Sequence, residues 1–161
     1  MNETKFTTDG NALTITRLFD TSLDLVWRAW TEAELLDQWW APKPWQSVTK
    51  SMDFKEGGKR LYAMRGPEGE EHWGLTTYTT IVKHESFSGE DAFADETGKI
   101  NEAFPVSTFQ TMLKKKGNQT LVVNISKYAS EEALKQTLEM GLEEGLSKAY
   151  ENLDHCLAAL K

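Results

Sequence analysis

The chain has 161 residues and a formal net charge of −7. This length is typical of one domain with its own core, so we expect a single domain over residues 1–161. An acidic chain without a basic patch argues against a nucleic-acid partner. Cys156 is the only cysteine, which excludes an intrachain disulfide and favours a reducing compartment. Because the start, residues 1–5, is polar and no apolar run is long enough to span a membrane, the sequence predicts a soluble, cytoplasmic protein.

The first elements along the chain are a β-strand and a short helix. Residues 13–19 alternate in side-chain character, which is the period of a strand. Asp20-Thr21-Ser22 then offers side-chain oxygens that can cap a helix. Trp27 and Trp30 are three residues apart on the apolar stripe of that helix, so we expect both to pack in the core.

A second short helix is predicted directly afterwards. Residues 31–34 have the spacing of a capping box, and Pro42 and Pro44 should end the helix. Trp39 and Trp40 are adjacent on it, so a regular helix cannot turn both inward. We expect one of them to pack in the core and the other to line the mouth of a cavity.

The middle of the chain, up to residue 128, has the pattern of an antiparallel sheet. Glycine and proline mark a turn at residues 66–69, and Lys116-Gly117-Asn118 is a strong hairpin signal. The strands predicted between such turns are approximately residues 57–64, 72–82, 86–93, 106–113 and 120–128.

The last part of the chain predicts one long helix. Ser130 to Leu160 contains no proline, and the Ser130 hydroxyl followed by two glutamates favours a helix start. Its apolar stripe is Leu134, Leu138, Leu142, Leu146, Ala149, Leu153 and Leu157. Strands bracketed by helices indicate an α+β fold, in which we expect a curved sheet to wrap this uninterrupted helix and enclose a space.

Several separate motifs resemble one family. They are FDTSLDLVWRAWT at residues 19–31, LLDQWW at 35–40, GGKR at 57–60, MRGPEG at 64–69, FADETG at 93–98 and MGLEEG at 140–145. Over roughly residues 12–160 the chain resembles the START-like (SRPBCC) superfamily, and specifically homologues of the activator of the heat-shock-protein-90 ATPase. The chain departs from that family at Arg60, where an aromatic residue is common, and at Leu146, where tryptophan is.

This resemblance implies a helix-grip fold with a cavity between the sheet and the C-terminal helix. Such cavities often hold apolar or amphipathic small molecules, and the relatives include enzymes and stress-response proteins. The resemblance places Arg60, Tyr62 and Met64, which share one strand face, toward the cavity. A guanidinium buried there needs an internal carboxylate, water or an anionic ligand. The alternative is that it reaches the end of the sheet or pairs with Glu70 or Glu71.

Other candidates lie in predicted loops and in the final helix. Trp45 and Trp73 fall in or near loops, where exposed aromatic residues are typical of binding sites. Gly141 and Gly145 lie four residues apart and share one face of the predicted helix. Small residues there would let a ligand approach the helix closely; the alternative is a close contact between helix and sheet with no ligand. The candidate ligand-binding residues are Trp39, Trp40, Arg60, Tyr62, Met64, Trp73, Phe109, Met140, Gly141 and Gly145.

The sequence gives no positive sign of catalysis or of a bound metal. His72, His84 and His155 lack metal-ligand spacing, and no nucleophile elbow or nucleotide-binding loop is present. We therefore expect binding of a small apolar or amphipathic molecule without metal or cofactor. The alternatives are an enzyme acting on a hydrophobic metabolite and a co-chaperone-like module acting on a chaperone ATPase. The sequence leaves open a homodimer and a chaperone partner.

Overall fold

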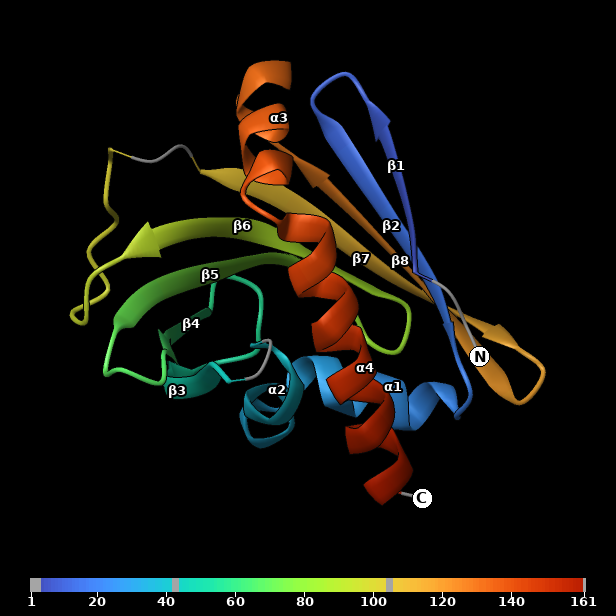
Figure 1. Ribbon diagram of the computed structural model, residues 1–161. Coiled ribbons are helices and arrows are strands. Elements are labelled where there is room, and N and C mark those ends of the chain that lie inside the picture. The colour runs from blue at the N-terminus through green and yellow to red at the C-terminus, as the bar shows by residue number, and fades with distance from the viewer. Residues whose placement is uncertain (1–3, 42–43, 104–105, 161) are drawn as a thin grey trace.

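The computed structural model describes residues 4–41, 44–103 and 106–160, and at its centre is a curved antiparallel sheet (Figure 1). Within these residues the sheet has eight strands in the order β1-β2-β8-β7-β6-β5-β4-β3. In chain order the strands are β1 (Lys5–Asp9), β2 (Ala12–Phe19), β3 (Gln46–Met52), β4 (Lys59–Arg65), β5 (Glu71–Val82), β6 (Ser86–Ala94), β7 (Ser107–Lys116) and β8 (Gln119–Lys127). The predicted α+β class is confirmed.

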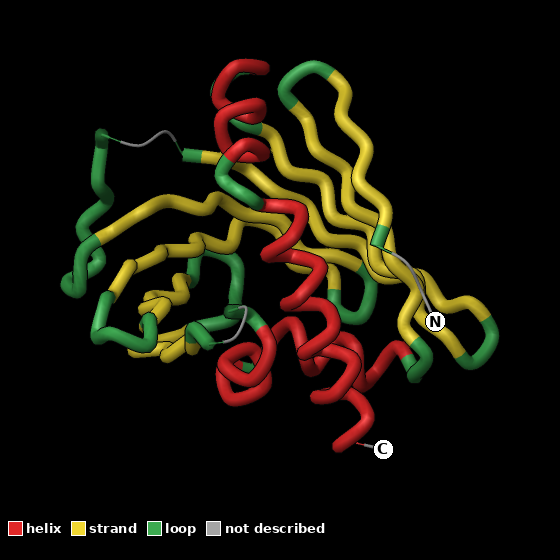
Figure 2. The backbone as a smooth tube through the Cα atoms, in the orientation of Figure 1, coloured by secondary structure: helices red, strands yellow, loops and turns green. Residues whose placement is uncertain are grey.

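Four helices lie on the concave side of this sheet within the described residues (Figure 2). They are α1 (Leu23–Thr31), α2 (Ala33–Trp39), α3 (Glu131–Glu139) and α4 (Leu142–Leu160). The Ser130 cap is confirmed, because its hydroxyl accepts the backbone N–H of Ala133 at 3.0 Å. Residues 1–3 of the polar start and Pro42, one of the two prolines expected to end α2, lie outside the described residues.

The capping box predicted at residues 31–34 is wrong. Thr31 is still the last residue of α1, so its hydroxyl donates back to the carbonyl of Trp27 at 2.8 Å. Glu32 is the N-cap of α2 instead, and its side chain makes no capping hydrogen bond. Ser22 does occupy the N-cap of α1, although its side chain forms no capping hydrogen bond either.

The prediction of one uninterrupted C-terminal helix is also wrong. The chain leaves α3 at Met140, and Gly141 has φ +90°, a left-handed conformation that glycine adopts without steric cost. The Gly141 N–H donates to the Leu138 carbonyl at 3.1 Å, which closes the last turn of α3. Only α4 crosses the concave face of the sheet, and α3 lies beyond the N-terminal end of α4 (Figure 1).

Arg17 fixes α4 against the sheet. From β2 it donates to the backbone carbonyl of Tyr150 at 2.9 Å and to the carboxylate of Asp154 at 2.5 Å. Tyr150 also packs edge-on against Phe19, with ring centroids 5.8 Å apart. Leu153, one turn further along α4, is completely buried. The long helix is therefore held by both polar and apolar contacts at its C-terminal half.

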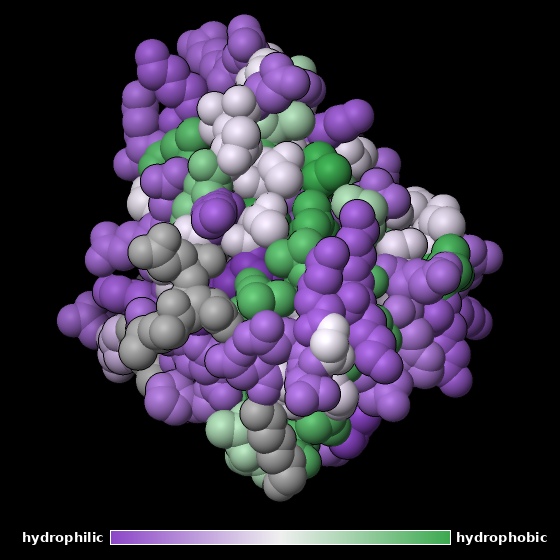
Figure 3. Space-filling model, turned by 90° about the vertical axis from the view of Figure 1, so that its right-hand side faces the viewer, coloured by the Kyte–Doolittle hydropathy of each residue, from purple (hydrophilic) through white to green (hydrophobic). Residues whose placement is uncertain are grey.

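The surface seen from the side is largely hydrophilic, with hydrophobic residues in small groups (Figure 3). This distribution agrees with the acidic composition and with a core collected between the sheet and the helices. No helix in the described part of the chain is both long and apolar enough to cross a membrane.

Candidate ligand-binding cavity

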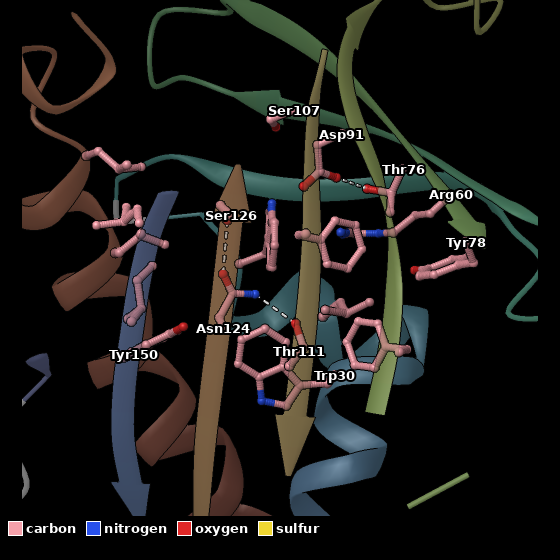
Figure 4. A pocket seen from close by; sticks show the side chains of 18 of the residues that line it. Trp30, Arg60, Thr76, Tyr78, Asp91, Ser107, Thr111, Asn124, Ser126 and Tyr150 are labelled. Atoms are coloured by element: carbon pink, nitrogen blue, oxygen red, sulfur yellow. Dashed lines mark hydrogen bonds between the residues drawn. The ribbon is translucent and has the colours of Figure 1, made fainter. Parts of the chain in front are cut away.

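A cavity of about 170 Å³ lies between the concave face of the sheet and helices α1, α2 and α4 (Figure 4). Most of its wall is aliphatic or aromatic: Leu13, Ile15, Trp30, Leu36, Trp40, Tyr78, Phe87, Phe109, Tyr128, Leu142, Leu146 and Tyr150. The polar residues in the wall are Arg60, Thr76, Asp91, Ser107, Thr111, Asn124 and Ser126.

Strand alternation places these side chains. In β7, Ser107, Phe109 and Thr111 are two residues apart and therefore point to the same face. Phe109 lies opposite Gly89 of β6, where an added Cβ would come within 3.0 Å of the Phe109 ring. Glycine at this position therefore leaves the space that the Phe109 ring occupies beside β6.

Asp91, in β6, is the carboxylate in the cavity wall. It is half-buried, and it accepts a hydrogen bond from the hydroxyl of Thr76 at 2.7 Å. Burial raises the pKa of Asp91 to about 6, while the Thr76 hydrogen bond and the charge of Arg60 act in the opposite direction. Figure 4 shows its carboxylate facing the interior of the cavity.

Arg60 is buried but its charge has a partner. The guanidinium lies 3.4 Å from the Asp37 carboxylate and donates to the hydroxyls of Ser47 at 3.0 Å and Thr49 at 3.2 Å. Of the partners considered for Arg60, an internal carboxylate is the one found, whereas the alternative pairing with Glu70 or Glu71 does not occur. Arg65 takes the Glu71 carboxylate at 2.7 Å, because the two residues face each other across β4 and β5.

Aromatic rings enclose the same guanidinium. Its carbon lies 4.1 Å from the centre of the Tyr62 ring and 5.5 Å from that of Trp40. Arrangements of this kind stabilise a cation by the negative face of the ring. Arg60 therefore reaches the cavity wall with its charge already satisfied by Asp37 and its faces covered by two rings.

A short chain of polar side chains crosses β8 and β7. Ser126 donates to the Asn124 amide oxygen at 3.1 Å, and the Asn124 amide nitrogen donates to Thr111 at 2.7 Å (Figure 4). Each amide atom of Asn124 has a partner, so this part of the wall is internally satisfied.

Other polar atoms of the wall lack such partners. The hydroxyls of Tyr78 and Tyr150 form no hydrogen bond with another described residue, and burial raises the pKa of both, so they stay protonated at neutral pH. Trp30 Nε1 is buried and also lacks a hydrogen-bond partner among the described residues. A ligand with polar atoms could satisfy groups of this kind.

A second hollow, of about 510 Å³, continues from the cavity beneath α3 and the α3–α4 junction. The two share Asp91, Ser107, Tyr128 and Leu142 in their walls. We call the first the inner cavity and the second the outer hollow. Asp91 therefore stands at their junction.

The predicted site residues divide between these places. Trp40, Arg60 and Phe109 line the inner cavity. Met140 and Gly141 line only the outer hollow, and Met140 is 83% exposed. They lie outside the inner cavity because the chain turns away from the sheet between α3 and α4.

The remaining predicted residues are not in the wall of either hollow. Trp39 is core, and its indole N–H donates to the Ala29 carbonyl at 2.9 Å. Tyr62 is on the cavity side of β4 but packs under Arg60 and over Gly74. Met64 and Gly145 likewise line neither hollow.

Trp73 lies near a loop, two residues after the start of β5, but it lines neither hollow. The residue is inside β5, paired with Ala63, so it points to the face opposite Arg60 and Tyr62. The Lys50 ammonium lies 5.8 Å from its ring there. Trp45, the other loop candidate, stacks on His72 at 5.5 Å.

Sequence reasoning missed Asp91, Thr76 and Tyr78 as cavity residues. Their signal was the alternation of the predicted strands, which puts Phe87 and Asp91 on one face of β6. No group of three or more His, Cys, Asp or Glu side chains within the described ranges could hold a metal ion.

The curved sheet with the α4 helix across it defines a START-like helix-grip domain. Residues 20–158 match the family model for Activator of Hsp90 ATPase homolog 1-like protein. The chain belongs to this family, and the predicted resemblance is confirmed.

Solved structures agree with this assignment. An Arthrobacter aurescens protein, determined by NMR in solution, has a TM-score of 0.89 at 32% identity, covering 96% of this chain and 91% of that one. A Mycobacterium smegmatis protein has a TM-score of 0.85 at 33% identity, covering 95% and 94%. A Nitrosomonas europaea protein has a TM-score of 0.81 at 25% identity, covering 92% and 94%. No curated protein is significantly similar in sequence.

Proposed function

We propose that this protein binds a small apolar or amphipathic molecule, without covalent chemistry, in the inner cavity and the adjoining outer hollow. Membership of the family supports a ligand-binding or co-chaperone-like domain. The observation that carries the finer proposal is the composition of the cavity wall. It is mostly aromatic and aliphatic, yet Asp91, Tyr78 and Tyr150 turn polar atoms toward the same space.

The size of the inner cavity sets the scale of the binding energy. Apolar atoms that fill about 170 Å³ would contribute up to about 4 kcal/mol at roughly 24 cal/mol per Å³. That energy alone corresponds to a dissociation constant of about 1 mM. A ligand that extends into the outer hollow buries further apolar surface, so we expect dissociation constants in the micromolar range.

Binding of N-phenyl-1-naphthylamine, a neutral apolar dye, tests the proposal. We expect saturable binding at about one site, with dye fluorescence enhanced and tryptophan fluorescence quenched, because Trp30 and Trp40 line the inner cavity. Ser107→Phe should weaken binding at least about tenfold by filling the junction between the two spaces. The matched control is Thr108→Phe, the next residue of β7, which is exposed on the other face.

Two results would overturn the proposal. One is a folded protein that shows no saturable dye binding. The other is Ser107→Phe and Thr108→Phe proteins with equal dye affinities, which would place the dye elsewhere on the surface.

Co-chaperone activity is the second candidate, and the name of the matching family favours it. It predicts that the purified protein binds a heat-shock-protein-90 chaperone and raises its ATPase rate. If the chaperone binds to the external surface of the protein and not to the cavity, Ser107→Phe should leave the stimulation of the ATPase unchanged. Unchanged ATPase rates at saturating protein would reject this candidate and leave the ligand-binding proposal standing.

A further inference from the structure

Asp91 and Arg60 are the charged side chains among the described residues that line the inner cavity, and they differ in how they are paired. The Arg60 guanidinium has the Asp37 carboxylate at 3.4 Å, two hydroxyl partners and two aromatic rings. An acidic ligand would have to compete with Asp37 for this guanidinium. Arg60 is therefore a poor receptor for an anionic head group.

The Asp91 carboxylate has no cationic partner at ion-pair distance among the described residues. Its one hydrogen bond comes from the neutral hydroxyl of Thr76, to Oδ1, at 2.7 Å. The second oxygen forms no hydrogen bond with a described residue and faces the interior (Figure 4). Because Asp91 also lines the outer hollow, any ligand that occupies both spaces passes this carboxylate.

We propose that Asp91 makes the cavity selective for apolar molecules that carry a protonated amine. The ammonium would lie at the junction of the two spaces and donate to the free oxygen of Asp91, while the apolar body fills the inner cavity. This inference rests on the proposed function, because it names the ligand class for the same cavity.

The electrostatic surroundings agree with this assignment. The groups that act on Asp91 are its hydrogen-bond partner Thr76 from β5 and Arg60 from β4, and Asp91 in turn raises the pKa of Tyr62, Tyr78 and Tyr128. Burial raises the pKa of Asp91 to about 6, so its ionised form lacks adequate compensation in the folded protein. A ligand ammonium supplies that compensation, whereas a ligand carboxylate adds repulsion.

Three probes of equal chain length test the proposal: octylamine, 1-octanol and octanoate, each displacing N-phenyl-1-naphthylamine at pH 7.5. Wild-type protein should bind octylamine at least about tenfold more tightly than octanoate. Asp91→Asn should weaken octylamine binding about tenfold and leave 1-octanol within about twofold. Asp9→Asn, an exposed hairpin residue, is the control for the equal change in net charge.

The pH dependence of the wild-type protein gives an independent measurement that requires no variant. Octylamine stays protonated throughout, so its affinity should be full at pH 8 and should fall toward pH 5 as Asp91 of the free protein becomes protonated. The affinity for 1-octanol should stay constant over the same range.

The outcomes separate the inference from the proposed function. If 1-octanol displaces the dye but octylamine and octanoate bind alike, or octylamine binding does not change between pH 8 and pH 5, the amine selectivity is refuted and the cavity remains a binding site. If neither the dye nor any of the three probes binds, the proposed function fails and the inference fails with it.

Discussion

Asp37 should contribute more to stability than Arg60 does, although Arg60 is the more buried of the two. The Asp37 carboxylate in α2 accepts from the Ser47 hydroxyl at 2.8 Å and from the Thr49 hydroxyl and N–H at 2.7 and 3.0 Å, in addition to the Arg60 guanidinium at 3.4 Å. Ser47 and Thr49 belong to β3, the edge strand. One carboxylate therefore ties a helix to the end of the sheet.

The two substitutions leave different groups unpaired. Asp37→Ala removes the acceptor of four donors and leaves a guanidinium side chain that is 3% exposed without its carboxylate. Breaking a buried pair costs about 3–5 kcal/mol, and because Asp37 is 27% exposed we expect the low end, about 3 kcal/mol. Arg60→Met leaves Asp37 with three donors at good distances, so we expect a loss of about 1 kcal/mol.

Urea denaturation at pH 7, followed by far-ultraviolet circular dichroism, measures both values. The expected difference of about 2 kcal/mol corresponds to about 4–8 °C in Tm for a chain of this size. Asp53→Ala, an exposed carboxylate, should stay within about 0.5 kcal/mol of wild type. If Arg60→Met proves as destabilising as Asp37→Ala, the guanidinium rather than the carboxylate organises this cluster, and the reasoning is refuted.

Three further predictions concern the final helices and the cavity. Leu153→Ala should cost about 3–5 kcal/mol in urea denaturation because Leu153 is fully buried, whereas half-buried Leu138→Ala should cost less than about 2 kcal/mol; equal values would contradict the assigned burial. Gly141→Ala should cost about 1–2 kcal/mol through its φ of +90° alone, since an added Cβ there meets open space, and an unchanged midpoint would refute the strain argument. The pKa of Asp91 is raised from 3.8 to about 6 in the folded protein. Between pH 4 and pH 6 the folded state therefore binds more protons than the unfolded state. The stability of wild type relative to Asp91→Asn should therefore fall by about 1–3 kcal/mol as pH rises from 4 to 7, and a constant difference would count against the raised pKa.

The C-terminal helix shows where periodicity is insufficient. The leucine stripe runs unbroken through Leu138 and Leu142, so its 3.6-residue period predicts one helix. Gly141 can be read either as a helix residue with a cost of about 1 kcal/mol or as the left-handed residue that ends α3, and the apolar pattern does not separate the two. The backbone of Gly141 decides between them: its φ of +90° ends α3, although α3 and α4 both contribute buried leucines to the core, Leu134 from α3 and Leu153 and Leu157 from α4.

The strands were predicted well where both alternation and turn signals were present. The ends of β5 and β6 agree with the predicted segments to within about one residue. β1 and β3 were not predicted as separate strands. β1 is an edge strand of mostly exposed residues, and the pairing of β3 shifts register between Thr49 and Ser51. Neither segment therefore shows the regular alternation of apolar and polar residues that predicts a strand.

The candidate site was predictable in part. Strand alternation put Arg60 on one face with Tyr62 and Met64, and the family resemblance turned that face toward the cavity. Alternation could also have put Asp91 on the same face as Phe87, four residues earlier. The partner of Arg60 could not be deduced, because Asp37 comes from α2, 23 residues earlier in the chain. Proximity in sequence favoured Glu70 and Glu71 as partners of Arg60, but Glu71 forms its ion pair with Arg65.

The two cavity charges differ in what they imply for a ligand. An anionic ligand was one of the partners considered for Arg60, and the Asp37 carboxylate removes the need for it. Ionisation of the buried Asp91 carboxylate destabilises the folded state, and the hydrogen bond from Thr76 offsets only part of this destabilisation. Asp91→Asn should therefore raise stability at pH 7 and lower octylamine affinity in the same protein. If stability and affinity fall together, Asp91 serves the structure of the sheet and not the recognition of a ligand.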